Sequence, residues 1–260
     1  MMSYFNVAAV FLAATLSDAL HPRPQFDNYA SFARWLVHES DYAVVSTHHK
    51  GSEVFGNIIS IADGNGYEDS TGVILTYLPD LDVTFMDLAV DSRVALTFSE
   101  MALGDGRSGG CVNSTAETPP CGRVTITGRM TLVPESHKAL ALKYLFARHP
   151  IMKSWGEQHN FQPFWIAKEN MTDLFVIDMY GGGQHPSAES YFAAPWHGTL
   201  PPAGSWNCAV CGHIYNATRD GDGKSFEELP DSWTCPVCGT PKSAYKKQEG
   251  SDGSVFWIHT

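Results

Sequence analysis

Four cysteines of this chain form two Cys-x-x-Cys pairs, Cys208/Cys211 and Cys235/Cys238, with 23 residues between the pairs. Two such pairs can bring four thiolates together as a tetrahedron, a geometry that suits zinc or a single iron ion. In an oxidising compartment the same thiols have an alternative use as disulfides, but paired Cys-x-x-Cys turns are more common as metal sites. The spacing therefore predicts a small metal-binding domain with these four ligands, and spacing alone favours zinc.

A Pro- and Gly-rich segment separates this domain from the rest of the chain. Residues 195–205 read PWHGTLPPAGS, a composition typical of a linker. The net charge of −11 is unevenly distributed, because residues 1–204 hold 12 basic and 21 acidic groups whereas residues 205–247 hold five of each. The acidity thus belongs to the first part of the chain. It argues against nucleic acid as a partner, since phosphate binding requires Lys and Arg.

The first residues have the pattern of a secretory signal. Asn6–Leu16 is an apolar run of 11 residues, too short to span a bilayer, and the small residues Ser17 and Ala19 suit cleavage before Leu20. A buried N-terminal helix is the alternative, and the lack of Lys or Arg before the run favours it slightly. Asn-x-Ser/Thr sequons at Asn113, Asn170 and Asn216 support secretion. We expect residues 1–19 to be a signal peptide and the mature chain to have no stable membrane insertion.

Hydrophobic periodicity in the first part predicts a mainly β domain. A helix is expected from Asp27 to about His38 and another over Glu135–Arg148, with an apolar face of Leu140, Leu142, Tyr144 and Leu145. Strands are expected at Tyr42–Thr47, Val54–Ala62, Gly72–Leu78, Val94–Ser99, Arg123–Leu132, Phe164–Ala167 and Leu174–Met179. So many strands with so few helices favour a closed or sandwiched sheet over a parallel, doubly wound one.

The four-cysteine segment resembles rubredoxins over residues 206–247. Trp206–Tyr215 is similar to the first metal-binding turn of that family, Leu229–Gly239 to the second, and Lys242 and Tyr245 follow as they do there. The resemblance implies one iron ion that exchanges single electrons and has no open position for substrate, with zinc as the alternative. We also expect a small aromatic core that limits water at the metal, built from Trp206, Tyr215, Phe226, Trp233 and Tyr245.

The two remaining cysteines, Cys111 and Cys121, most simply form a disulfide in a secreted chain. A catalytic thiol is the alternative, although neither cysteine has an evident Cys/His context. Residues 24–194 resemble the CREG family of secreted and endolysosomal glycoproteins, through Arg148–Trp155, Phe164–Thr172 and Asp178–Gly182. The resemblance implies a split β-barrel of the FMN-binding, flavin-reductase and pyridoxamine-phosphate-oxidase type, with a homodimer through the barrel. The expected fold is therefore mainly β (α+β), a split barrel plus a rubredoxin-like domain.

FMN is an alternative cofactor of the barrel, because it sits at the dimer interface of flavoproteins with this fold. Its phosphate needs cationic or N–H donors, yet Val54–Ala62 contains no Lys or Arg. The nearby candidates are Lys50, Arg93, Ser46, Thr47 and Ser60. The pairs His48/His49 and His149/His159 offer imidazoles for a metal or haem, but structural or exposed histidines are more common.

These features predict a redox protein in which a rubredoxin-like iron site passes single electrons and is tethered to a CREG-like barrel. We expect it to be secreted or to lie in an endomembrane or lysosome-like lumen. A plastid with extra membranes is a further alternative, because import into such a plastid begins with the same kind of signal. The alternative is a non-enzymatic, dimeric glycoprotein that binds a receptor or lysosomal partner and carries a structural zinc ribbon. The residues identify neither the redox partner nor a role for the tail, 248–260, and they leave open whether the barrel is an FMN-dependent oxidoreductase.

Overall fold

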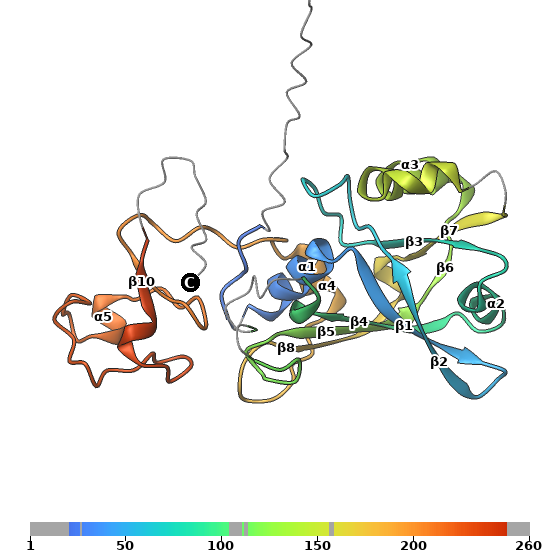
Figure 1. Ribbon diagram of the computed structural model, residues 1–260. Coiled ribbons are helices and arrows are strands. Elements are labelled where there is room, and N and C mark those ends of the chain that lie inside the picture. The colour runs from blue at the N-terminus through green and yellow to red at the C-terminus, as the bar shows by residue number, and fades with distance from the viewer. Residues whose placement is uncertain (1–20, 27, 104–110, 112–113, 156–158, 249–260) are drawn as a thin grey trace, which may run out of the picture.

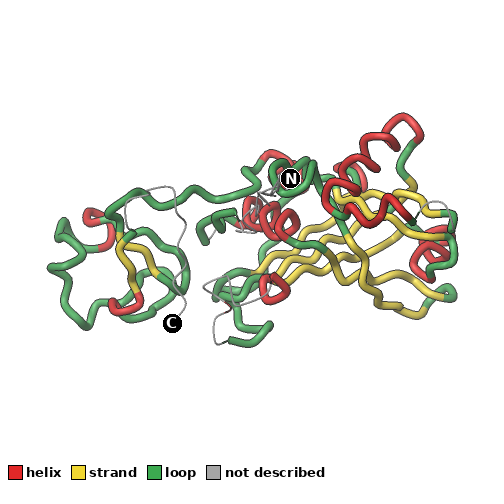
Figure 2. Tube along the Cα trace, turned by 45° about the horizontal axis from the view of Figure 1, so that its top comes forward, coloured by secondary structure: helices red, strands yellow, loops and turns green. Residues whose placement is uncertain are grey.

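The computed structural model describes residues 21–26, 28–103, 111, 114–155 and 159–248. The expected signal peptide, the sequon Asn113 and all of the tail except Gln248 therefore lie outside the described residues. The chain forms a large β domain and a small loop-rich domain at one end of it (Figures 1 and 2). Among the described residues, no helix has both the length and the apolar character needed to cross a membrane.

The large domain consists of two antiparallel sheets. The five-stranded sheet has the order β2-β1-β4-β5-β8 and the three-stranded sheet the order β3-β7-β6. The strands are β1 Tyr42–His49, β2 Glu53–Ser60, β3 Ile74–Pro79, β4 Arg93–Ser99, β5 Arg123–Arg129, β6 Thr131–Leu132, β7 Phe161–Ile166 and β8 Met171–Ile177. The prediction of a mainly β split barrel is confirmed.

One stretch of chain joins the two sheets. The expected strand Arg123–Leu132 is interrupted at Met130, so that β5 belongs to the first sheet and β6 to the second. Just before the interruption, the β5–β8 register shifts between Thr127 and Gly128. A Cβ at Gly128 would lie 2.4 Å from the carbonyl oxygen of Asn170, so only glycine fits this close approach. The shift allows the chain to turn from one sheet into the other.

Helices cover the ends and the outer side of the barrel (Figure 1). They are α1 Tyr29–Glu39, α2 Val83–Val90, α3 Glu135–Arg148 and α4 Ala188–Ala193, with short 3₁₀ turns η1 Glu100–Leu103, η3 Pro150–Ser154 and η4 Lys168–Asn170. Helices α1 and α3 occur where the sequence predicts them. Helices α2 and α4 were not predicted. Both are short, and side chains cap them at their N-termini, Asp82 for α2 and Ser187 for α4.

The predicted apolar face of α3 is wrong in part. The helix buries Ala141, Leu145 and Arg148, whereas Leu140 is 48% exposed. Ala141 and Leu145 pack with Tyr77 of β3 in a cluster outside the main core. The three buried positions follow i, i+4 and i+7, so the helix presents a single stripe to the sheet. Its rotation is set by the sheet surface that it covers.

The small domain begins at β9 Trp206–Cys208, which pairs antiparallel with β10 Tyr245–Lys247. Between these strands lie α5 Ala217–Asp220 and η5 Lys242–Ala244. Most of the domain is loop, as Figure 2 shows. Its buried cluster consists chiefly of cysteines and aromatic side chains.

Candidate metal centre

Two turns of the same construction, which we call knuckles, hold the four cysteines. In the first knuckle the amide of Gly212 donates to the carbonyl of Cys208 (2.8 Å), and in the second the amide of Gly239 donates to the carbonyl of Cys235 (2.8 Å). Both glycines have positive φ, +68° and +71°. This conformation costs other residues about 1–2 kcal/mol. The turn geometry thus explains why a glycine follows each Cys-x-x-Cys pair.

The knuckles bring the four sulfur atoms within 4.8 Å of one another. The Sγ atoms of Cys208 and Cys238 are 3.7 Å apart, and those of Cys211 and Cys235 are 3.5 Å apart. A tetrahedron with metal–sulfur bonds of about 2.3 Å has edges of about 3.8 Å, whereas the sulfurs of a disulfide are about 2.05 Å apart. The arrangement therefore fits one four-coordinate metal ion better than two disulfides.

The electrostatics of the cluster also favour a cation. Backbone N–H groups donate to the ligand sulfurs from Val210, Cys211, His213 and Thr240. A hydrogen bond with the Cys211 thiol lowers the pKa of Cys208 to about 5, and the same contact raises the pKa of Cys211. Burial raises the pKa of Cys238 to about 12. Without a cation some thiols therefore stay protonated, whereas a bound metal ion allows all four to lose their protons.

An aromatic core surrounds the cysteines, as predicted. Phe226, only 4% exposed, lies at its centre. The ring centroids of four neighbours lie 4.5–5.8 Å from that of Phe226, and these neighbours are Trp206, Tyr215, Trp233 and Tyr245. Such contacts bury apolar surface around the thiolates and so limit the access of water to the metal site.

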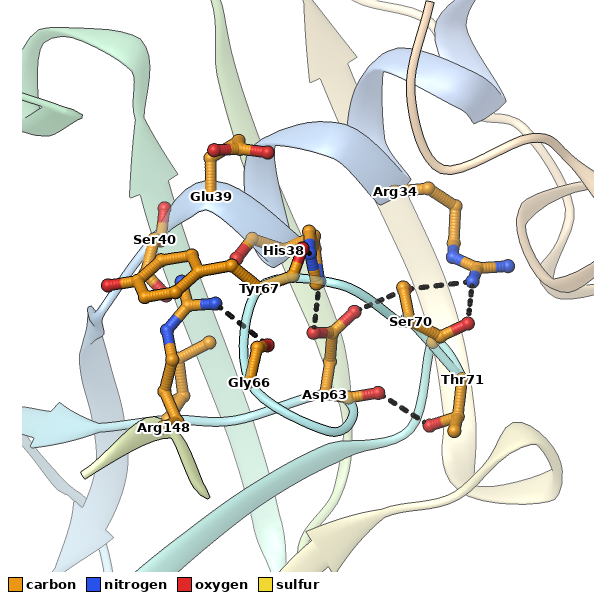
Figure 3. Close-up of polar contacts among 12 residues, drawn as sticks. Arg34, His38, Glu39, Ser40, Asp63, Gly66, Tyr67, Ser70, Thr71 and Arg148 are labelled. Atoms are coloured by element: carbon orange, nitrogen blue, oxygen red, sulfur yellow. Dashed lines mark hydrogen bonds and ion pairs between the residues drawn. The ribbon is translucent and has the colours of Figure 1, made fainter. Parts of the chain in front are cut away.

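The large domain contains a buried ionic network that the sequence did not predict (Figure 3). His38 of α1 has no exposed side-chain surface, and its Nδ1 lies 2.7 Å from Oδ1 of Asp63. Its Nε2 lies 2.8 Å from the carbonyl oxygen of Tyr67. Asp63 accepts a second hydrogen bond from the Ser70 hydroxyl, and its carbonyl accepts one from Thr71. Because both ring nitrogens face acceptors, only the protonated ring can donate to both of them.

Two arginines fix the same loop from opposite sides. Arg34 of α1 donates to the carbonyl of Ser70 (2.9 Å), and Arg148 of α3 donates to the carbonyl of Gly66 (3.2 Å), as Figure 3 shows. The Arg148 guanidinium also lies 3.5 Å from the centre of the Tyr67 ring. Arg34 and His38 are one helical turn apart on α1. This spacing of two polar residues on the buried side of an otherwise apolar helix is the sequence signal that could have indicated the network.

His38 also belongs to a second group of potential metal ligands. Atoms of His21, His38 and Glu39 lie within 4.8 Å of one another. However, His38 uses both ring nitrogens in the network, and Nδ1 of His21 lies 2.7 Å from Oε1 of Glu39. We therefore interpret this group as structural hydrogen bonding.

Comparison with known proteins agrees with this architecture. A family model described as "CREG, beta-barrel" matches residues 24–193. The chain belongs to the CREG family. A rubredoxin family model matches residues 205–245, which contain the four ligand cysteines and the aromatic core. The structure thus combines a CREG barrel with a C-terminal rubredoxin domain.

Curated CREG proteins resemble this chain through the barrel. Protein CREG1 of Gallus gallus is 32% identical over 199 residues, a match that covers 74% of this chain and 97% of the relative. Protein CREG2 of Mus musculus is 33% identical over 184 residues, which cover 68% and 60% of the two chains. A solved haem-binding protein from Mycobacterium smegmatis has a TM-score of 0.51 and 14% identity, covering 64% of this chain and 60% of that one. At that identity the likeness concerns the fold alone.

The CREG barrel carries a groove of about 420 Å³, lined by residues of β1, β4 and β5 among others. Three of the predicted phosphate contacts, Ser46, Thr47 and Arg93, line it. Lys50 lies outside it, in the turn between β1 and β2. Ser60 is paired with Tyr42 at the other end of the β1–β2 ladder. The structure therefore brings three of the five candidates together and separates the other two.

Three of the polar groups in this groove have partners within the chain. The guanidinium of Arg93 lies 2.5 Å from a carboxylate oxygen of Asp91. The Thr47 hydroxyl donates to Asp87 (2.7 Å). Arg129, which sequence reasoning missed, also lines the groove and donates to Ser92 (3.2 Å). In the described chain these three groups do not form a phosphate cradle, and FMN binding stays a prediction.

The histidine pairs that the sequence singled out do not form cofactor sites in the described residues. His48 lines the groove, whereas Nδ1 of the adjacent His49 lies 2.8 Å from Asp87. Nε2 of His149 lies 2.8 Å from the carbonyl oxygen of Ile61, and His159 is exposed. These contacts indicate structural and surface roles.

The remaining predicted residues fall on the surface or beside the barrel core. Cys111 and Cys121 form a disulfide. Asn170 is half-buried in η4, and Asn216 is exposed at the N-terminus of α5, where its side-chain oxygen accepts from the amides of Thr218 and Arg219. The side-chain nitrogen of Asn216, where a glycan would attach, has no part in that cap. Glycosylation of both asparagines stays a prediction.

Proposed function

We propose that this chain is a redox protein whose rubredoxin domain binds one iron ion and transfers single electrons, tethered to a CREG barrel. The observation that carries the proposal is the set of four sulfurs within 4.8 Å, surrounded by amide donors and an aromatic core. Iron held by four thiolates supplies one-electron exchange without an open position for substrate.

The residues around the cluster have separate tasks in this proposal. Cys208, Cys211, Cys235 and Cys238 hold the ion. Backbone amides that donate to their sulfurs stabilise the negative charge of the thiolates and so tune the potential. Phe226 and its aromatic neighbours limit the access of water. No proton has to move, because the ligand set is complete in both oxidation states.

Metal analysis with visible absorption spectroscopy tests the proposal directly. The full chain, purified from the medium of cells that secrete it, should hold about one iron ion and show thiolate-to-iron charge-transfer bands that dithionite bleaches. Cys238→Ser should change or abolish those bands. Stoichiometric zinc without such bands would refute electron transfer by this domain.

We propose further that the protein is secreted or resides in an endomembrane or lysosome-like lumen. The Cys111–Cys121 disulfide and the exposed sequon Asn216 support an oxidising, glycosylating route. Treatment with an endoglycosidase should increase the electrophoretic mobility of the secreted chain. Asn170→Gln and Asn216→Gln should each remove one glycan, and a chain without any glycan would contradict this route.

A second candidate is a dimeric glycoprotein whose small domain is a structural zinc ribbon. An exposed apolar patch on the barrel favours it, because Val44 of β1 lies opposite Ile58 of β2, and these side chains are 42% and 58% exposed. A homodimer through this sheet would cover the patch. In this case Cys208→Ser should lower the stability of the small domain but leave dimerisation and partner binding by the barrel intact.

No flavin step belongs to either proposal, because Thr47, Arg93 and Arg129 do not form a phosphate cradle in the groove. An FMN-dependent reductase remains an outcome of the purification experiment. Yellow, protein-bound flavin that reduces the iron would support it, and a barrel that takes up no added FMN would exclude it.

A further inference from the structure

The two knuckles have the same local construction but different surroundings. Each has the pattern Cys-x-Val-Cys-Gly, and each glycine makes the same hydrogen bond. Cys211 of the first knuckle is 1% exposed, whereas Cys238 is half-buried. The valines differ in the same direction, since Val210 is partly buried and Val237 is 42% exposed. Because the two knuckles share one pattern, residues outside the pattern must cover the first knuckle.

Two side chains of the barrel belong to the apolar cluster of the rubredoxin domain. Phe26, which precedes α1, is buried together with Cys208 and Cys211, and Met179, which follows β8, packs against the same cluster. Val210 is a further member of the cluster. Phe26 is only 7% exposed. The first knuckle therefore lies on the side of the domain that contacts the barrel.

A buried ionic contact holds Phe26 in place. The guanidinium of Arg23 lies 4.0 Å from the centre of the Phe26 ring and 4.3 Å from that of Phe32. It also lies 2.7 Å from a carboxylate oxygen of Glu100 and 3.9 Å from one of Asp178, the residue before Met179. Both carboxylates are fully buried. Arg23 thus connects the segment that carries Phe26 to the chain that carries Met179.

The linker is fixed to the barrel at one end and to the rubredoxin domain at the other. The amide of Gly198 donates to the carbonyl of Pro22 (2.6 Å), and the Ser31 hydroxyl donates to the carbonyl of Pro195 (2.5 Å). At the other end the amide of Gly204 donates to the carbonyl of Gln248 (2.7 Å). Only residues 199–203 remain between these anchors. The span is much shorter than the full 11-residue tether that the composition predicts.

We propose that Phe26 and Met179 form a docking site for the first knuckle of the chain's own rubredoxin domain. The second knuckle, Pro236–Gly239, is then the port through which the metal exchanges electrons with other molecules. The port, but not the docking, rests on the proposed function. Thr234–Pro241 contains no ionisable side chain other than the ligands, so this segment adds no side-chain charge of its own where a redox partner approaches the metal.

Nuclear magnetic relaxation of the full, zinc-loaded chain tests the docking. In the wild type the amides of the rubredoxin domain should tumble with the rotational correlation time of the barrel. In the double variant Phe26→Ala/Met179→Ala that time should fall at least twofold for the rubredoxin domain alone, and the barrel spectrum should change only near Arg23 and Phe32. Ile151→Ala, which removes an apolar side chain that is 67% exposed elsewhere, is the matched control and should have no effect. Independent tumbling in the wild type would overturn the docking.

Oxidation of the iron-loaded, dithionite-reduced chain by ferricyanide tests the port. Val237→Asp should slow this reaction several-fold at low ionic strength, because the new carboxylate repels the anionic oxidant at the exposed knuckle. In the Phe26→Ala/Met179→Ala background, Val210→Asp should slow it by a similar factor, since both knuckles are then exposed. An unchanged rate for Val237→Asp, with an unchanged absorption spectrum, would refute the port. A chain that carries only zinc would refute the proposed function and the port, while the relaxation experiment still decides the docking.

Discussion

The imidazole of His38 and the carboxylate of Asp63 lie 2.7 Å apart in the barrel, and both side chains are almost completely buried. Burial alone would lower the pKa of His38, but the hydrogen bond and charge of Asp63, together with the Tyr67 carbonyl and the charge of Glu39, outweigh it and raise that pKa above its usual 6.5. The pair connects α1 to the loop before β3, and it makes the stability of the barrel depend on pH.

A raised pKa in the folded state means that the protonated ring stabilises the fold. The stabilisation is complete below the unfolded pKa of about 6.5 and is lost as pH rises through the folded pKa. We expect the free energy of unfolding in urea to fall in the wild type as pH rises from about 6.5 through the folded pKa of His38. In His38→Gln this fall should be smaller, and the variant should be about 3 kcal/mol less stable at the acidic end. His185→Gln, at an exposed ion pair, is the control; an unchanged pH profile in His38→Gln would contradict the prediction.

Glycine at the knuckles should matter for the metal beyond its effect on the backbone. Gly212 and Gly204 both have positive φ, and a Cβ at either would meet open space. Replacement of either glycine by alanine should therefore destabilise its domain by about 1–2 kcal/mol of backbone strain. Only Gly212→Ala should also speed the transfer of zinc to a chelator, because its turn directs amides at the sulfurs. Equal release rates for the two variants would show that the turn does not support the site.

Removal of the central aromatic ring should loosen the metal site. Phe226→Ala should lower the stability of the rubredoxin domain by about 3–5 kcal/mol, because it leaves a cavity among four aromatic neighbours. The temperature at which the domain releases its metal should fall accordingly. Val237→Ala, at an exposed position of the same domain, should change that temperature little. A similar fall in both variants would argue against a tightly packed core.

The two groups of cysteines should contribute to stability independently. The double variant Cys111→Ser/Cys121→Ser should lower the stability of the barrel by about 2–4 kcal/mol and leave metal content unchanged. Cys235→Ser should do the reverse, abolishing metal binding with little effect on the unfolding of the barrel. Calorimetry of the full chain with metal analysis measures both effects. Loss of metal from the first variant would indicate exchange between the two groups.

Features that depend only on residues close together in the sequence could be predicted. Each knuckle closes within a few residues, so Cys208–Gly212 and Cys235–Gly239 could be recognised from local spacing alone. The limits of α3, Glu135–Arg148, were equally local. The rotation of α3 was not, because the sheet surface decides that Ala141 is buried while Leu140 is exposed.

Contacts between distant segments were not accessible. His38 and Asp63 are 25 residues apart, and their pairing depends on how the loop after β2 folds over α1. The contact of Phe26 with the rubredoxin domain depends on a linker whose composition predicts freedom. The groove shows the same limit, because Ser60 lies near Thr47 in sequence but at the other end of a strand ladder. A hydroxyl side chain alone therefore does not identify which residues line the groove.

The contact between the linker and the first described residues has a consequence for biosynthesis. Ser31 and Pro195 are 164 residues apart, so the hydrogen bond between them cannot form until the ribosome has produced the whole barrel. Until then the segment that carries Arg23 and Phe26 has no linker to pack against. The rubredoxin domain emerges after the barrel and meets a docking site that is already complete. The order of synthesis therefore favours a barrel that folds first and receives the metal-binding domain afterwards.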